Sequence, residues 1–186
     1  MSTMKDLIHR VVFLDIDGVL NEIRSTSRCC GFIGIDNSKA QTLSTIINND
    51  VFEIEPLVVL TSTWKSDWER VECLEDLSKC GQYLVKHLHR CGIHIFDKTE
   101  DVYEETKNRR GQSILNWLEK VKQDGVKIES FVILDDEMFD YEELGLTDRL
   151  VKTSFYDTPG GLQESDVPKT IEILKRPIEL YTERKI

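Results

Sequence analysis

Polar residues suited to metal and phosphate chemistry follow three short apolar runs of the chain. These segments are Asp15-Ile16-Asp17 after residues 11–14, Thr61-Ser62-Thr63 after residues 57–60, and Asp135-Asp136 after residues 131–134. Carboxylates that gather at one place repel each other unless a cation or a shared proton offsets the repulsion. Hard oxygen ligands of this kind suit Mg²⁺. We therefore expect a magnesium site if the three runs end side by side.

The spacing of hydrophobic residues predicts the strands and helices that position these polar residues. The three runs are apolar on both faces and rich in β-branched residues, which is typical of buried strands in a parallel sheet. Weaker strand candidates are residues 93–96 and 150–151. Helical spacing predicts helices over residues 40–47, 64–77, 84–91, 114–121 and 167–174. This alternation predicts an α/β fold with a doubly wound, mostly parallel sheet, in which ligands bind beyond the carboxyl ends of the strands.

Length and composition narrow the class of protein. The chain has 186 residues, of which 40% are hydrophobic and 31% charged, as in a globular protein with one domain and its own core. No apolar run is long enough to span a membrane, and the first residues lack the apolar stretch of a signal peptide, so we expect a cytoplasmic protein with no membrane partner. The net charge of −10 argues against strong non-specific binding to nucleic acids.

The five cysteines support the same compartment. They are an odd number without a regular framework, which predicts free thiols in a reducing environment. No CxxC pair is present, which argues against a zinc ribbon. The cysteines are Cys29, Cys30, Cys73, Cys80 and Cys91.

The first polar segment belongs to FLDIDGVLN, residues 13–21, which resembles motif one of the haloacid dehalogenase-like (HAD) superfamily of phosphotransferases. The other three motifs follow in the superfamily's order, with Ser62 in LTSTW, Arg110 in RRGQSILNWL, and FVILDDE at residues 131–137. Together with a late GGL, these segments resemble the HAD domain of RNA-repair-type proteins that process polynucleotide ends. The resemblance covers about residues 11–155. It implies one HAD-like domain over residues 1–186, with a Rossmann-like core, little or no cap domain, and a C-terminal helix at about 167–174.

The resemblance also implies a role for each matched residue. Asp15 would be the nucleophile that forms an aspartyl-phosphate, and Asp17 the general acid and base. Ser62 would hydrogen-bond a phosphoryl oxygen and Arg110 would stabilise developing charge. Gly18 would permit the sharp turn after the nucleophile. Gly18 and Thr63 would contact the substrate. Mg²⁺ would be held by the carboxylates of Asp15 and Asp136 and by the main-chain carbonyl of Asp17. Asp135 is the other candidate for the carboxylate ligand.

Several alternatives remain open at this point. The motif-three cation is usually lysine, so Arg109 and Lys107 compete with Arg110. If Arg110 is an exposed residue in the first turn of a helix, Arg110→Ala lowers turnover and leaves the fold intact. Trp64 and Trp68 stand four residues apart beside motif two, where core packing is favoured over contact with a substrate ring.

These observations together predict a Mg²⁺-dependent phosphatase. About 14 residues separate Asn21 from Asp36, too few for a folded cap domain. An uncovered site suits a phosphate on a large molecule, and a nucleic-acid end, a nucleotide and a phosphoprotein remain open as the phosphorylated substrate. No obligatory protein partner is evident. The alternatives are a catalytically idle HAD-fold binding module and a small-metabolite phosphatase.

Overall fold

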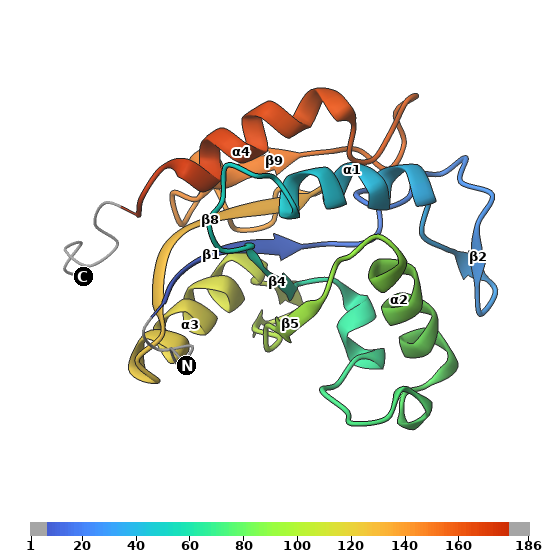
Figure 1. Cartoon of the computed structure of the whole chain (residues 1–186), viewed down its shortest axis with the longest axis horizontal. Helices are drawn as coiled ribbons and strands as arrows, with labels where there is room; N and C mark the ends of the chain where they lie inside the picture. The colour runs from blue at the N-terminus through green and yellow to red at the C-terminus, as the bar shows by residue number, and fades with distance from the viewer. Residues whose placement is uncertain (1–6, 179–186) are drawn as a thin grey trace.

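The computed structural model describes residues 7–178, and its centre is a sheet of five parallel strands in the order β5–β4–β1–β8–β9 (Figure 1). In the middle of the sheet, Val11 of β1 lies opposite Leu57 of β4 on one side and Phe131 of β8 on the other. The carboxyl ends of all five strands therefore meet at one edge. The strands are β1 (Ile8–Leu14), β4 (Leu57–Leu60), β5 (Ile95–Lys98), β8 (Lys127–Asp135) and β9 (Leu150–Lys152).

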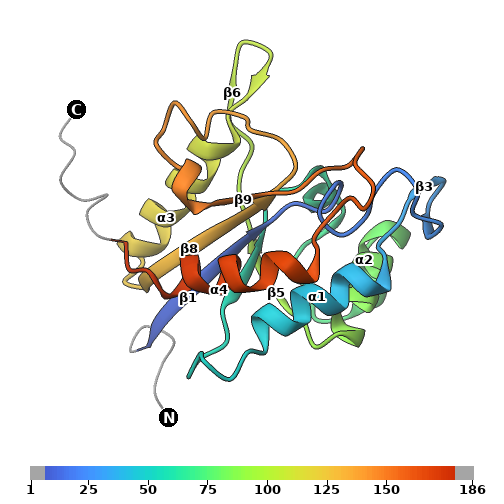
Figure 2. The same cartoon turned by 90° about the horizontal axis from the view of Figure 1, so that it is seen from above.

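Helices cover both faces of this sheet. Helices α1 (Asn37–Ile47) and α4 (Val167–Lys175) contact each other on one face, as Figure 2 shows from above. Helix α2 (Lys79–Arg90) contributes to the same apolar cluster, whereas α3 (Arg110–Gln123) packs on the opposite face. This layering is the Rossmann-like arrangement that the resemblance implies.

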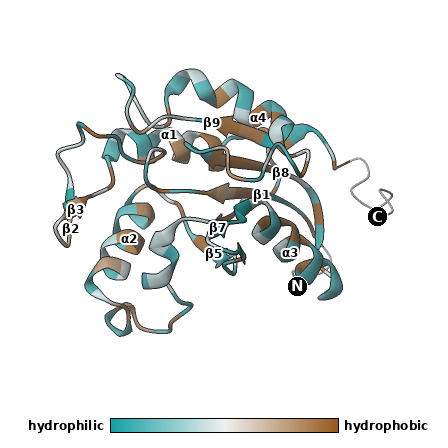
Figure 3. Ribbon diagram, turned by 180° about the vertical axis from the view of Figure 1, so that it is seen from behind, coloured by the Kyte–Doolittle hydropathy of each residue, from teal (hydrophilic) through white to brown (hydrophobic). Residues whose placement is uncertain are grey.

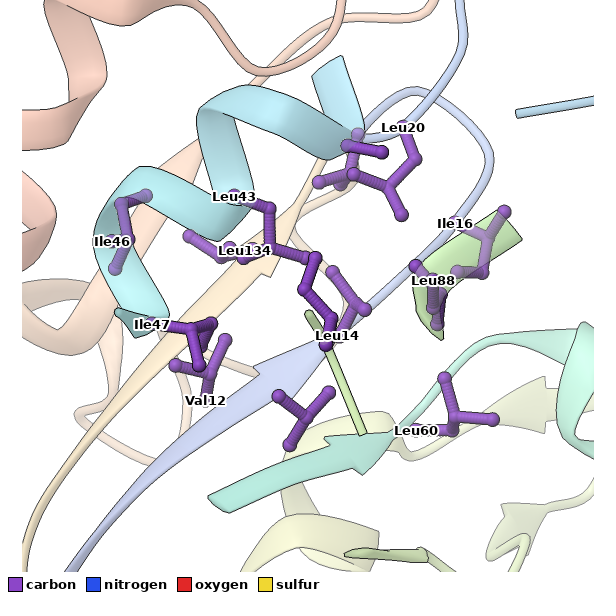
Figure 4. Packing of buried hydrophobic residues seen from close by; sticks show 14 of the residues in the cluster. Val12, Leu14, Ile16, Leu20, Leu43, Ile46, Ile47, Leu60, Leu88 and Leu134 are labelled. Carbon is purple, nitrogen blue, oxygen red and sulfur yellow. The ribbon is translucent and has the colours of Figure 1, made fainter. Parts of the chain in front are cut away.

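The alternation of side chains along the strands explains the two-sided burial. Val12 and Leu14 of β1 face α1, where they pack with Leu43 and Ile46 (Figure 4). The intervening Phe13 points to the other face and meets the ring of Trp117 of α3 edge-on, with ring centroids 5.5 Å apart. Figure 3 shows hydrophobic residues concentrated in the neighbouring strands β1, β8 and β9, with many hydrophilic residues on the helices.

Short elements lie beyond the strand ends. Strands β2 (Arg28–Cys29) and β3 (Phe32–Ile33) form an antiparallel hairpin, and β6 (Tyr103–Glu104) pairs with β7 (Lys107–Asn108) in another. Four 3₁₀ turns complete the described elements. They are η2 (Thr63–Asp67), η3 (Leu74–Asp76), η4 (Thr147–Arg149) and η5 (Glu164–Asp166).

The predicted helix over residues 64–77 is wrong. The chain forms only the two 3₁₀ turns η2 and η3 there, separated by irregular backbone. The Lys98 ammonium donates to the carbonyl oxygens of Lys65 (3.0 Å) and Trp68 (2.6 Å), so contacts from β5 occupy groups that a longer helix would use. The other four predicted helices form, and the predicted strand at 93–96 begins two residues later, at Ile95.

Between Asn21 and Asp36 the chain holds only the β2–β3 hairpin, and none of the residues 7–178 forms a separate cap domain over the sheet. Within the same residues, no helix has the length and apolar character needed to cross a membrane.

Candidate active site

The three polar segments meet at the carboxyl edge of the sheet because β1 lies between β4 and β8. Backbone hydrogen bonds extend the strand pairing past the strand ends, since Asp15 N–H donates to Leu134 and Thr61 N–H donates to Leu14. A cavity of about 750 Å³ opens at this edge. Its lining includes Asp15, Asp17, Thr63, Trp64, Arg110 and Asp136.

Arg110 is the first residue of α3 and is a buried part of the cavity lining. Its Nη1 is 3.2 Å from Oδ1 of Asp15 and 2.7 Å from Oδ2 of Asp135. The Phe139 ring lies 4.1 Å from the guanidinium carbon. Burial alone lowers the pKa of Arg110, but the two carboxylates raise it above its ordinary value. Arg110 is only 6% exposed, which contradicts the expectation that it is a solvated first-turn residue.

Asp135 is fully buried, and its carboxylate is already occupied by protein donors. Oδ2 accepts from Arg110 and from the Tyr141 hydroxyl at 2.8 Å, and Oδ1 accepts from the Glu137 N–H at 3.0 Å. Burial and the neighbouring Asp135 raise the pKa of Tyr141, so its hydroxyl stays protonated and remains a donor. Asp135 thus anchors Arg110, whereas Asp136 is the carboxylate that lines the cavity.

The electrostatics of the cluster favour a cation. Burial raises the pKa of Asp15 to about 7; Arg110 opposes this shift and Asp135 adds to it. Burial and the nearby charge of Asp135 also raise the pKa of Asp136. Carboxylate oxygens of Asp15, Asp135 and Asp136 lie within 4.8 Å of one another, close enough to share one ion. These hard oxygen donors fit Mg²⁺.

The pKa of Asp15 predicts how stability depends on pH without metal. The Asp15 carboxyl has a pKa of about 7 in the folded protein and of about 4 in the unfolded chain, so between these pH values only the folded protein keeps the proton. The free energy of unfolding of the metal-free protein should therefore fall as the pH rises from about 4 to about 7. A tenfold difference in proton affinity between the folded and the unfolded chain corresponds to about 1.4 kcal/mol. Urea unfolding in EDTA at pH 5 to 8 measures this slope. Asp15→Asn should flatten it, and equal slopes in both proteins would contradict the assignment.

Asp17 is held in place by two donors. The Asn21 amide donates to its Oδ1 at 2.8 Å, and the Trp64 indole donates to its Oδ2 at 3.0 Å. Gly18 turns the chain with a φ of +74°, and a Cβ there would lie 2.3 Å from Cγ of Asp136. The N–H of Gly18 donates to Asn21, and its carbonyl accepts from Thr153 at 2.6 Å. The N–H and the carbonyl of Gly18 therefore both form hydrogen bonds that fix the conformation of the loop.

The remaining motif residues fall at different depths. Ser62 is buried and accepts from the Trp64 N–H at 3.4 Å, and its side chain lowers the pKa of Asp15. Thr63 is exposed in the cavity lining. Arg109 is not part of the cavity lining and forms two hydrogen bonds to Glu143. Exposed Lys107 belongs to β7. Among the three candidate cations, the structure places Arg110 against Asp15.

The free-thiol expectation is wrong for two cysteines, since Cys30 is bonded to Cys80. The bond joins the β2–β3 hairpin to α2, and it escaped prediction because the two residues lie far apart in the sequence. Cys29, Cys73 and Cys91 are free thiols.

Several supporting residues carry no signal in the sequence. The Tyr141 hydroxyl donates to Asp135 and the Phe139 ring contacts Arg110, but neither residue belongs to a motif, and the turn after β8 brings both to the site. Trp64 packs against the apolar cluster, as the sequence favours, and its indole N–H in addition orients Asp17, which the sequence did not indicate. Asp140 accepts from the N–H groups of Gly111 (2.6 Å) and Gln112 (3.1 Å), so it occupies the start of α3.

A comparison with known protein families matches most of the chain. Residues 11–167 match the family model described as the HAD domain in Swiss Army Knife RNA repair proteins. The matched region contains every residue that lines the cavity of Asp15. The chain matched no curated protein and no solved structure.

Proposed function

Because the chain belongs to the family of HAD domains in Swiss Army Knife RNA repair proteins, we propose that it is a Mg²⁺-dependent phosphomonoester hydrolase. Membership supports a HAD-type hydrolase; the metal and the covalent mechanism are our proposal. The observation that carries it is the placement of Asp15. Its carboxylate lies at the end of the central strand, lines the cavity and contacts buried Arg110 at 3.2 Å.

The first half-reaction transfers the phosphoryl group to the protein. An oxygen of Asp15 attacks phosphorus, the bond from phosphorus to the substrate oxygen breaks, and Asp17 gives its proton to the departing alkoxide. Asn21 and Trp64 hold the Asp17 carboxyl during this transfer. Arg110 stabilises the charge that develops beside Asp15.

The second half-reaction releases phosphate. Asp17, now a carboxylate, takes a proton from water as the water oxygen attacks phosphorus. The bond between phosphorus and Asp15 breaks, which restores the free carboxylate. Asp17 is therefore an acid in one step and a base in the next.

Mg²⁺ would be held by the carboxylates of Asp15 and Asp136 and by the main-chain carbonyl of Asp17. When bound, the ion neutralises the negative charge shared by the phosphate and the carboxylates. We favour Asp136 over Asp135 as the ligand because Asp135 already accepts from Arg110, Tyr141 and Glu137.

We further propose that the phosphate is carried on a polynucleotide end. The family description refers to RNA repair. The cavity also lacks a cap domain among the described residues, so a phosphate on a large molecule can reach Asp15. A phosphoprotein and a small metabolite are the competing substrates.

A phosphate-release panel tests this proposal. Wild-type protein with Mg²⁺ should hydrolyse 3′- or 5′-phosphorylated oligonucleotides, with kcat/KM at least about tenfold above that for sugar phosphates and phosphopeptides, or ~1.4 kcal/mol. EDTA should abolish phosphate release, and added Mg²⁺ should restore it. Absence of release from every substrate would favour an idle binding module, and a preference for phosphopeptides would reassign the substrate.

A further inference from the structure

Two strongly exposed aromatic side chains line the cavity that holds Asp15. Phe32 of the β2–β3 hairpin is 74% exposed, and Tyr156 in the loop after β9 is 75% exposed. Both belong to the same cavity lining as Asp15 and Asp17. Exposed aromatic rings beside a polar site offer flat surfaces on which another ring can stack.

Both ring-bearing segments are tied to the body of the protein. The hairpin of Phe32 is joined to α2 by the Cys30–Cys80 bond. The loop of Tyr156 is joined to the segment after β1, because Ile23 N–H donates to the Phe155 carbonyl at 2.9 Å. The Phe155 ring meets the Tyr156 ring edge-on, with centroids 5.2 Å apart. Segments held in this way lose little conformational freedom when a ligand binds.

The charges around the cavity limit how much of a nucleic acid this surface can hold. Asp67 and Glu137 line the same cavity as Asp136 and add to its negative potential. A strand that continued over these carboxylates would bring its phosphodiesters against like charge. Stacking, by contrast, uses the π-face that every base possesses and needs no positive groove.

We propose that Phe32 and Tyr156 form a stacking subsite for the base of the nucleotide that carries the scissile phosphate. The subsite recognises one terminal nucleotide and accepts any base. This inference rests on the proposed phosphatase function. It adds that the enzyme recognises the base of the substrate as well as its phosphate. The nucleotide can be a free nucleotide or the last nucleotide of a strand. In the second case the rest of the strand lies outside the cavity.

The test compares substrates with and without the base. The substrates are a phosphorylated oligonucleotide, the same oligonucleotide with an abasic terminal nucleotide, a nucleoside monophosphate, and ribose 5-phosphate. Phe32→Ala and Tyr156→Ala should each lower kcat/KM about 5- to 100-fold on the base-bearing substrates. Hydrolysis of the two base-free substrates should change by less than about twofold. Phe32→Trp and Tyr156→Phe should retain wild-type kcat/KM.

Binding gives a readout that does not depend on turnover. In the Asp15→Asn background, an oligonucleotide ending in phosphorylated 2-aminopurine should lose fluorescence on binding, and Phe32→Ala with Tyr156→Ala should remove that quenching. Tyr103→Ala is the matched control, because Tyr103 is a 60% exposed aromatic residue on the β6–β7 hairpin, outside the cavity lining.

The outcomes separate the two proposals. Wild-type activity that is equal on base-bearing and abasic substrates, or equal losses on both in the variants, overturns the stacking subsite and leaves the phosphatase standing. Phosphopeptide as the preferred substrate also overturns it. Absence of wild-type phosphate release from every substrate means that the phosphatase proposal itself fails.

Discussion

Asp15→Asn should abolish turnover on every phosphorylated substrate, with a loss in kcat on the order of 10⁴-fold or more, as expected for a covalent nucleophile. The amide cannot form the bond to phosphorus, so intact-mass spectrometry after an acid quench should show no added phosphoryl group. The fold should survive, because the carboxylate is replaced by a group of the same shape. Retained turnover in a preparation free of other phosphatases would contradict covalent catalysis.

Asp17→Asn is the matched control for this experiment. The variant keeps Asp15, Arg110 and Asp136 and loses only the group that moves protons. With an activated aryl phosphate, whose leaving group hardly needs a proton, the first step should proceed and the second should stall. Phosphorylated protein should therefore accumulate in Asp17→Asn and be absent from Asp15→Asn.

Arg110→Ala should destabilise the protein by about 3–5 kcal/mol, because it leaves the buried Asp135 without its cation. Asp135 is fully buried and Asp15 is 5% exposed, so water cannot replace the guanidinium easily. Urea unfolding measures the loss. This expectation corrects the one drawn from the sequence, in which an exposed Arg110 contributes little to stability.

Two further variants identify the cause of that loss. Asp135→Asn in the Arg110→Ala background should recover part of the stability, since the unpaired charge disappears together with its partner. Lys107→Ala, at an exposed position of β7, should leave both stability and turnover unchanged. An unfolding midpoint of Arg110→Ala equal to that of the wild type would show that the two ion pairs contribute nothing.

The sheet was predictable because it depends on short-range patterns, and the individual site residues were predictable because they match the motifs of the HAD superfamily. Apolar runs with β-branched residues indicate buried strands wherever they occur, and parallel strands must end at one edge. Asp15, Ser62 and Asp136 lie at the same edge of the sheet because of these two facts and because β1 lies between β4 and β8.

The failures share a different physical origin. Residues 64–77 have helical spacing, but Lys98 on a neighbouring strand takes the carbonyls of Lys65 and Trp68. Arg110 occupies a first helical turn that is commonly solvated, but the turn after β8 places the Phe139 ring against its guanidinium, and Asp135 pairs with it. Each failure depends on a contact between segments that are distant in the chain, and local periodicity carries no information about such contacts.

The strand order has a consequence for synthesis on the ribosome. Strand β1, which carries Asp15 at its end, pairs with β4 on one side and with β8 on the other, so its second edge stays uncovered until β8 has been synthesised. At about 5–20 residues per second, the interval between completion of β4 and completion of β8 lasts several seconds. During that interval the nascent chain exposes an unpaired edge of its central strand, and Asp15 lacks its buried neighbour Asp135. Chains terminated before β8 should be recognised by chaperones or proteases as unfolded, and the site should assemble only when nearly the whole domain has left the ribosome.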